Sequence, residues 1–129
     1  MDGLPSSLVR QFHEVFGLAA ADRPTTPPGD LVEARQRLLE EEVRELADAV
    51  RGGRLDEVAR ELADVVYVAY GTAVTYGIDL DAVLREVHRA NMSKLGPDGR
   101  PLIRDGKVQR GDGFRPPDVA GVLGRQRDG

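Results

Sequence analysis

The sequence contains no cysteine, no tryptophan and no long apolar run. Without cysteine the chain cannot form disulfides, thiolate zinc sites or a cysteine nucleophile, which suits a cytoplasmic location. The first residues lack the basic segment followed by an apolar stretch that marks a signal peptide, so none is expected. No stretch approaches the roughly 20 apolar residues that cross a bilayer, so we expect no membrane association.

Aromatic residues make up only 5% of the chain, against 40% hydrophobic residues in all. A core would therefore be built mainly from Leu, Val and Ala. The net charge of −4 disfavours binding to DNA or RNA, which depends on exchanging counterions for Lys and Arg. An anionic ligand would have to be met by a few local cations or by a metal ion. The length of 129 residues suits one domain.

Helical periodicity predicts four helices, and therefore an all-α, antiparallel four-helix bundle over residues 1–129. The helical core would span about 6–95, and 96–129 would be a loop-rich tail with a short hairpin near 102–108 and a short helix near 117–123. Residues 22–29 are rich in proline and should be extended. The expected helices run from Ser6 or Ser7 to about 20, from after Asp30 to about 51, from near Asp56 to 76, and from after Asp79 to about 95.

The second predicted helix carries acidic residues where its pattern calls for apolar ones. Leucines such as Leu38 and Leu46 define one face, and Glu42 and Glu45 fall in the middle of that face, with Glu41 at its edge. Unpaired buried carboxylates are costly unless they are protonated or neutralised. These acids therefore call for a partner.

The third predicted helix shows the same conflict in a weaker form. Glu61 and Asp64 stand one turn apart within a largely apolar helix, although on its least apolar stripe. The positions four residues after Glu42, Glu45, Glu61 and Asp64 hold only Leu, Ala and Val, so helix-internal salt bridges do not explain the set.

A divalent metal ion would explain these acids. Two E-x-x-E/D pairs on antiparallel neighbouring helices can aim four carboxylates at one point, and Mg²⁺ and Mn²⁺ prefer oxygen ligands. The absence of His and Cys from the set argues against zinc. Either pair alone would more often be an ordinary solvated helix face, so the prediction of a metal site depends on both pairs.

Two isolated features fit no metal site. Gly71 lies inside the third predicted helix at a cost of about 1 kcal/mol relative to Ala, and close approach of another helix, within the chain or across a dimer interface, would explain it. His13 and His88 are expected to be packing or surface residues.

The two acidic pairs, separated by fifteen residues, resemble the metal signature of the all-α nucleotide pyrophosphohydrolases. That superfamily includes MazG proteins, dimeric dUTPases and phosphoribosyl-ATP pyrophosphatase. Further segments are similar to it, and the likeness spans about residues 31–94 and is strongest to short, single-domain MazG-like enzymes. These segments are LLEEEVRELADAV, ELADVVYVAYGTAVTYGID and EVHRANMSK, with a looser echo in GKVQRGDGFRPPDV.

The resemblance implies a helical homodimer that uses Mg²⁺ or Mn²⁺ to split a nucleoside triphosphate, dUTP among the candidates, into a monophosphate and pyrophosphate. It implies Glu42, Glu45, Glu61 and Asp64 as metal ligands, with Glu41 as candidate general base or merely an exposed edge residue. A phosphoribosyl-ATP pyrophosphatase-like enzyme and a non-catalytic, metal-binding or interaction dimer remain alternatives. The implied substrate-binding residues are Asn91 and Lys94, with Lys107, Arg110 and Arg115 of the tail as weaker candidates.

Overall fold

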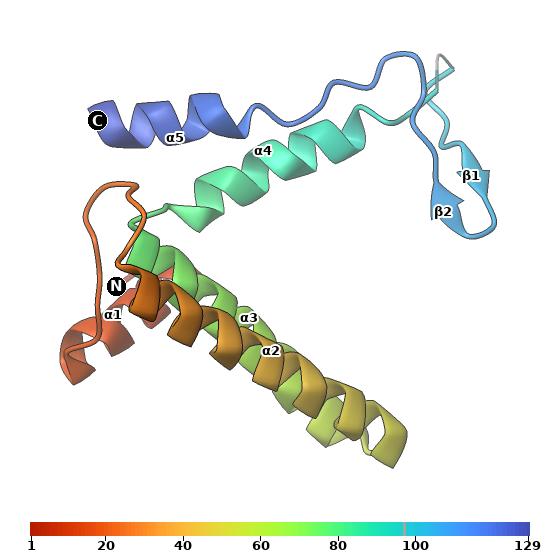
Figure 1. Cartoon of the computed structure of the whole chain (residues 1–129). Coiled ribbons are helices and arrows are strands. Elements are labelled where there is room, and N and C mark those ends of the chain that lie inside the picture. The colour runs from red at the N-terminus through yellow and green to blue at the C-terminus, as the bar shows by residue number, and fades with distance from the viewer. Residues whose placement is uncertain (97) are drawn as a thin grey trace. The chain divides into compact units, whose positions relative to one another are not determined.

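The computed structural model describes residues 1–96 and 98–129, and within them the chain is mainly helical. Residues 1–79 and 80–129 form two compact units, each of which is described by itself. Figure 1 labels the five helices and the two short strands of the described residues. They are α1 (Pro5–Phe16), α2 (Gly29–Gly52), α3 (Leu55–Tyr76), α4 (Leu80–Met92), β1 (Ile103–Arg104), β2 (Lys107–Val108) and α5 (Val119–Asp128).

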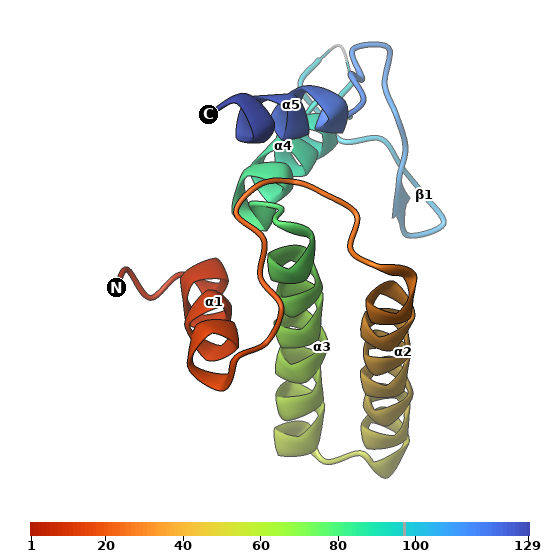
Figure 2. The ribbon, with the colours of Figure 1, turned by 60° about the vertical axis from the view of Figure 1, so that its left-hand side comes forward.

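In the first unit α3 lies between α1 and α2 (Figure 2). Only Gly53 and Arg54 separate α2 from α3, and so short a connection makes the two helices antiparallel neighbours, as predicted. The buried apolar side chains concentrate on α3 and the helix faces that meet it. They are Val9, Ala49, Tyr70, Ala73 and Val74.

Glycines in the left-handed conformation end the first three helices. Gly53 and Gly77 end α2 and α3 as predicted, with φ of 74° and 72°. The first helix stops at Phe16 rather than near residue 20, because Gly17 adopts φ 68° and donates its N–H to the carbonyl of His13. The predicted extension of α1 to residue 20 is therefore wrong.

The polar N-caps predicted for these helices are also wrong. The N-cap positions hold Leu4, Pro28 and Arg54, and none of them makes a side-chain capping hydrogen bond. Asp30 and Asp56 lie instead within the first turns of α2 and α3, where a negative charge is favoured by the helix dipole.

The proline-rich connector between α1 and α2 is non-helical, as predicted, and it follows the end of α3. Ala21 donates its N–H to Val74 O (3.1 Å) and Thr25 donates to Tyr76 O (2.9 Å). Gly77 is required here twice, because its φ is positive and because a Cβ would collide with the carbonyl of Arg23. The connector thus fixes how α3 ends.

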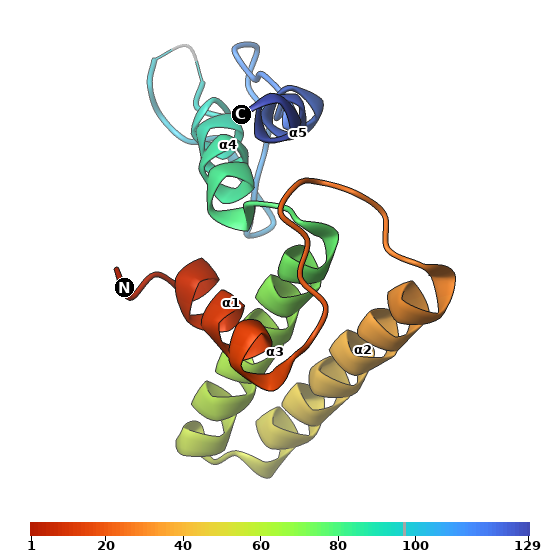
Figure 3. The ribbon, with the colours of Figure 1, turned by 90° about the vertical axis from the view of Figure 1, so that its left-hand side faces the viewer.

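The second unit consists of α4, the hairpin and α5, with α5 packed beside α4 (Figure 3). The hairpin pairs Ile103 with Val108 and Arg104 with Lys107. Asp105 and Gly106 both have positive φ, which is typical of a two-residue type I′ turn. The hairpin is confirmed, whereas the predicted short helix near 117–123 is longer and runs to Asp128.

Helix α4 ends at Met92, short of the predicted end near residue 95. The hydroxyl of Ser93 donates to Ala90 O (2.6 Å) and accepts the N–H of Arg115 (2.9 Å), so the chain leaves the helix to meet the returning segment. Lys94 therefore lies in a turn after α4 rather than in its last helical turn. The four-helix bundle stays a prediction, because its helices are divided between the two units, each of which is described by itself.

Candidate metal centre

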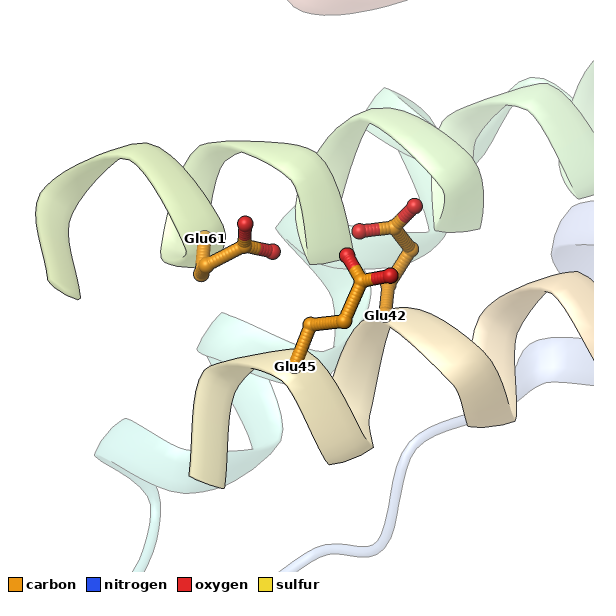
Figure 4. Close-up of side chains that lie close together, drawn as sticks. All are labelled: Glu42, Glu45 and Glu61. Carbon is orange, nitrogen blue, oxygen red and sulfur yellow. The ribbon is translucent and has the colours of Figure 1, made fainter. Parts of the chain in front are cut away.

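Three carboxylates meet between α2 and α3. Glu42 and Glu45 project from α2 and Glu61 projects from α3 toward them (Figure 4). One oxygen of each side chain lies within 4.8 Å of the other two. Two of the three acids come from one turn of α2, and antiparallel pairing with α3 supplies the third.

None of these three side chains is paired with a cation in the part of the chain that the structure describes. Glu42 and Glu61 are half-buried, and one oxygen of each, Oε2, is inaccessible to solvent and lacks a hydrogen-bond partner. Glu45 is exposed at the rim. A buried acceptor without a partner is costly, so the site calls for positive charge from a ligand.

The electrostatic consequence falls on Glu42. Loss of solvent, followed by repulsion from Glu45, Asp64 and Glu61, raises the pKa of the Glu42 carboxyl from 4.5 to about 7. A proton on Glu42 is one way to relieve the crowding, and a divalent cation is another.

Asp64 and Glu41 lie outside the three-carboxylate group. The side chain of Asp64 is 41% exposed and lies 3.9 Å from Arg60 Nε, although its charge still contributes to the raised pKa of Glu42. Glu41 is exposed on α2. The geometry thus assembles three of the four predicted ligands and sets the fourth beside them.

The three clustered side chains suit a hard divalent ion. Every donor is a carboxylate oxygen, which Mg²⁺ and Mn²⁺ prefer, and two of the oxygens are already buried without partners. A groove of about 370 Å³ opens beside the cluster and gives a ligand access to it. Its lining residues are Glu45, Asp48, Ala49, Glu57, Arg60 and Glu61.

The predicted substrate-binding residues all belong to the second unit. Asn91 is exposed on α4, Lys94 is half-buried in the following turn, and Lys107 is exposed on β2. Arg115 is exposed, and its backbone N–H donates to Ser93 Oγ (2.9 Å). Among residues 80–96 and 98–129, no hydrogen bond or ion pair joins these four side chains.

Arg35 is a residue of this helix pair that sequence reasoning missed. Its guanidinium crosses from α2 to α3, donating from Nη2 to Val68 O (2.9 Å) and from Nε to Thr72 Oγ1 (3.2 Å). Burial lowers its pKa. The signal was present, because Arg35 lies two turns before Glu42 on the apolar face of the same helix.

Gly71 makes this crossing possible. A Cβ at Gly71 would collide with Arg35 Nη2 and would lie 3.0 Å from Nε2 of the buried His13. The close neighbours of Gly71 are thus side chains of two other helices, α1 and α2, in line with the expected close approach of another helix. His13 is a packing residue, as expected, and its Nδ1–H donates to Ala19 O (2.9 Å).

Comparison with known proteins places this site in a family. The sequence profile of phosphoribosyl-ATP pyrophosphohydrolase matches residues 9–91, which include the three clustered acids and Arg35. The chain therefore belongs to this family, part of the all-α pyrophosphohydrolase superfamily that its acidic pairs resemble.

Proteins similar to the chain include one from a virus and one from a bacterium. An uncharacterized protein of Acanthamoeba polyphaga mimivirus is 33% identical over 99 residues, which cover 77% of this chain and 33% of the viral protein. The chain thus spans about a third of that relative's length. The second is a candidate NTP pyrophosphohydrolase from Exiguobacterium sp. 255-15 with a known crystal structure. Its sequence is 28% identical to this one, the match covers 95% of this chain and 92% of that one, and the TM-score is 0.44.

Among the described residues, no helix of this chain is long and apolar enough to cross a membrane.

Proposed function

We propose that this protein is a divalent-metal-dependent pyrophosphohydrolase that cleaves a nucleoside triphosphate into a nucleoside monophosphate and pyrophosphate. The observation that carries the proposal is the convergence of Glu42, Glu45 and Glu61 without a cation, in a chain whose family is pyrophosphohydrolases. One water molecule is consumed, and the phosphoric anhydride between the monophosphate and the pyrophosphate is broken.

Glu42, Glu45 and Glu61 would hold Mg²⁺ or Mn²⁺, with Asp64 as fourth ligand. Asp64 is one turn from Glu61 and close enough to influence the Glu42 carboxyl, which supports that role. When bound, the ion supplies positive charge to phosphate oxygens and makes water more acidic. The cluster itself contributes carboxylate oxygens from two helices, two of which are inaccessible to solvent.

Glu41 is the proposed general base. It lies next to the cluster in sequence and is not needed as one of the clustered ligands. Its exposure is equally expected of a solvated residue at the edge of the helix face with no catalytic role. Turnover of Glu41→Gln at saturating Mn²⁺ separates the two, because near-normal activity removes Glu41 from the mechanism while a loss of about 100-fold or more supports it.

Asn91 and Lys94 are proposed to bind phosphate oxygens of the substrate, with Lys107 and Arg115 as further contacts. A Lys ammonium and an amide N–H₂ are both donors that suit phosphate. These four residues lie in the second unit, so their substitutions are expected to act on substrate binding while leaving metal binding unchanged.

The substrate is proposed to be a small nucleotide, with dUTP as the first candidate. The alternative is phosphoribosyl-ATP, which the name of the matched family favours. Release of pyrophosphate from dUTP, dCTP, dTTP, the common NTPs and phosphoribosyl-ATP, measured side by side with Mg²⁺ and Mn²⁺, decides between them.

The same assay tests the proposed function itself. Glu42→Gln should abolish turnover of whichever substrate is active, whereas Glu40→Gln, an exposed acid on the same helix, should leave it unchanged. Equal effects from both variants would contradict the assignment. Mn²⁺ binding without turnover of any compound would support the non-catalytic metal-binding alternative instead.

A homodimer is also proposed, because apolar side chains of α1 and α3 are exposed around a groove of about 360 Å³. They include Leu8, Leu62, Val66 and Tyr67, which are 45%, 51%, 49% and 40% exposed. A contiguous patch of this kind commonly marks an association surface. Sedimentation of Val66→Glu beside the wild-type protein tests this, and a monomeric wild-type protein would rule it out.

A further inference from the structure

The acidic cluster and the Arg35 crossing share one register of the α2–α3 pair. Arg35 lies seven residues before Glu42 on α2, and Val68, which accepts its hydrogen bond, lies seven residues after Glu61 on α3. Seven residues make nearly two helical turns, so on each helix the two positions lie on the same face, about 10 Å apart along the axis. Because the helices are antiparallel neighbours, the alignment that sets Arg35 beside Val68 also sets Glu42 beside Glu61.

The cluster by itself opposes this alignment. Oxygens of Glu42, Glu45 and Glu61 lie within 4.8 Å of one another, and like charges at such distances repel (Figure 4). Glu42 and Glu45 share one helix, so the repulsion that involves Glu61 acts between α2 and α3 and favours their separation. Before a cation binds, other contacts have to hold the two helices together at this level.

Two connections between the helices lie on either side of the cluster. On one side the residues Gly53 and Arg54 join α2 to α3 covalently. On the other side Arg35 donates from Nη2 to Val68 O (2.9 Å) and from Nε to Thr72 Oγ1 (3.2 Å). A helix pair joined at one end can open or slide at the other, so hydrogen bonds on the far side of the cluster limit both movements.

The Arg35 side chain is well suited to this restraint. A guanidinium stays charged in a folded protein, and its donors have a planar, fixed arrangement. The side chain is half-buried and lies against Gly71, where a Cβ would collide with Nη2. Val68 O belongs to the backbone of α3, so this hydrogen bond fixes a position along α3 directly rather than through a mobile side chain.

We propose that Arg35 is a positioning residue for the metal centre. Its two hydrogen bonds hold α2 and α3 at the separation and register at which the three carboxylates can share one divalent ion. Arg35 acts through the two helices, since about two turns separate it from the cluster. The inference deepens the proposed function and rests on it for the ion.

The sign of the effect distinguishes positioning from simple electrostatics. A guanidinium about 10 Å from the cluster repels a cation, so by charge alone its removal should tighten the binding of a divalent ion. Loss of positioning should weaken binding, because the carboxylates are less often in the arrangement that holds the ion. The two explanations therefore predict opposite changes in Kd.

The first test measures Mn²⁺ binding to the full-length protein by calorimetry. Arg35→Met removes the donors, keeps an apolar stem, and should weaken binding about five- to tenfold, less than the loss of a group bonded directly to a ligand. Arg35→Lys should recover part of this loss, because an ammonium can still donate to one acceptor. Arg37→Met, with the same charge change at an exposed position of α2, should not weaken binding.

A second pair of variants changes no charge. Thr72→Val removes one acceptor of Arg35 and should weaken Mn²⁺ binding about twofold to threefold. Thr75→Val is the matched control on the same helix, because the Thr75 hydroxyl donates to Ala19 O (3.2 Å) rather than bonding to α2. This control should leave the Kd unchanged, although it also removes a hydrogen bond.

A third measurement needs no metal. The chain has no cysteine, so Arg44→Cys and Arg60→Cys place spin labels at exposed positions of α2 and α3, next in sequence to Glu45 and Glu61. In EDTA, the distribution of distances between the labels should be longer and broader with Arg35→Met than without it. Unchanged label distances would overturn the proposal.

Other outcomes would also overturn it. Mn²⁺ binding by Arg35→Met as tight as that of the wild-type protein, or tighter, would show that only its charge matters. Equal losses from Thr72→Val and Thr75→Val would show that Kd merely follows stability. If Arg35→Met does not fold, Arg35→Lys and Thr72→Val carry the same test. A wild-type protein that binds no Mn²⁺ would overturn the proposed function, and the label distances would then decide on the Arg35 restraint by themselves.

Discussion

The two ends of the α2–α3 helix pair both hold charged side chains between the helices, but they differ in whether the chain supplies hydrogen-bond partners for them. Near the start of α2 and the end of α3, a charged side chain is half-buried between the helices, and the chain satisfies it, since Arg35 donates to Val68 O and Thr72 Oγ1. Near the opposite end, Glu42, Glu45 and Glu61 meet with two buried oxygens that the described chain leaves without partners.

The difference shows where a ligand is needed. A buried polar group that serves only the fold normally has its hydrogen-bond partners within the chain, as Arg35 does. A polar group left unpaired at a cost to stability points to a partner from outside the chain. The acidic end therefore lacks the hydrogen-bond partners that the Arg35 end has, and a bound cation would supply them.

The largest expected effect concerns metal and the acidic end. At a concentration 100 times its Kd, an ion that binds only the folded state stabilises it by about 2.7 kcal/mol. Mn²⁺ should therefore raise the Tm of the wild-type protein by several degrees, and Glu61→Gln should remove the shift. Glu57→Gln, which lines the neighbouring groove, should keep most of it. Unchanged Tm values for the wild-type protein with Mn²⁺ or Mg²⁺ would sink the metal centre.

The next effect is a pH dependence without metal. The unfolded chain releases the Glu42 proton near pH 4.5 and the folded chain near pH 7, so the folded state binds more protons between these values. Stability should fall as the pH rises through this window, by on the order of 1 kcal/mol once solvent screening is allowed for.

Glu42→Gln supplies the control for this pH dependence. It cannot ionise, so urea unfolding at pH 5 and pH 7.5 in EDTA should show a smaller difference for the variant than for the wild-type protein. A wild-type protein that gains stability across the same window would contradict the raised pKa of Glu42.

A smaller effect tests the Arg35 end. Gly71→Ala should gain about 1 kcal/mol of helix propensity but displace Arg35 from its two acceptors, and a net loss of about 1 kcal/mol is expected. In an Arg35→Ala background, the collision with Arg35 is gone and His13 Nε2 at 3.0 Å is the nearest remaining neighbour, so the same substitution should cost less than in the wild-type protein. Additive free energies of unfolding in this double-mutant cycle would show that Arg35 and Gly71 are not coupled.

The contrast between the two ends also explains what the sequence could predict. Glu42 and Glu45 were predictable because each interrupted an apolar helical face, and Glu61 followed from its spacing on the next helix. Arg35 interrupted the same face, yet its acceptors are the Val68 carbonyl and the Thr72 hydroxyl on another helix, and periodicity carries no information about such distant partners.

At the helix ends, residue type alone does not predict the boundaries. Ser6, Asp30 and Asp56 are good capping residues by type, but Pro5 at the start of α1 and the flanking turns place each helix start upstream of them. The end of α4 depends on Ser93 meeting Arg115, a contact 22 residues away in sequence. Long-range contacts of this kind decide boundaries that propensity alone cannot.

The smallest predicted effect asks whether Asp64 completes the acidic end. Arg60 lies 3.9 Å from Asp64 on the exposed side, and exposed pairs of this kind contribute about 0.2–1 kcal/mol. If Asp64 turns from Arg60 to the metal, Arg60→Ala should tighten Mn²⁺ binding about twofold, with little change in stability. Arg51→Ala removes the same charge from a pair on α2 with Asp48, which is not among the clustered acids, and serves as control. If Asp64 is a ligand that Arg60 restrains, only Arg60→Ala should tighten Mn²⁺ binding. Equal tightening by both variants would indicate a general charge effect and leave Asp64 out of the site.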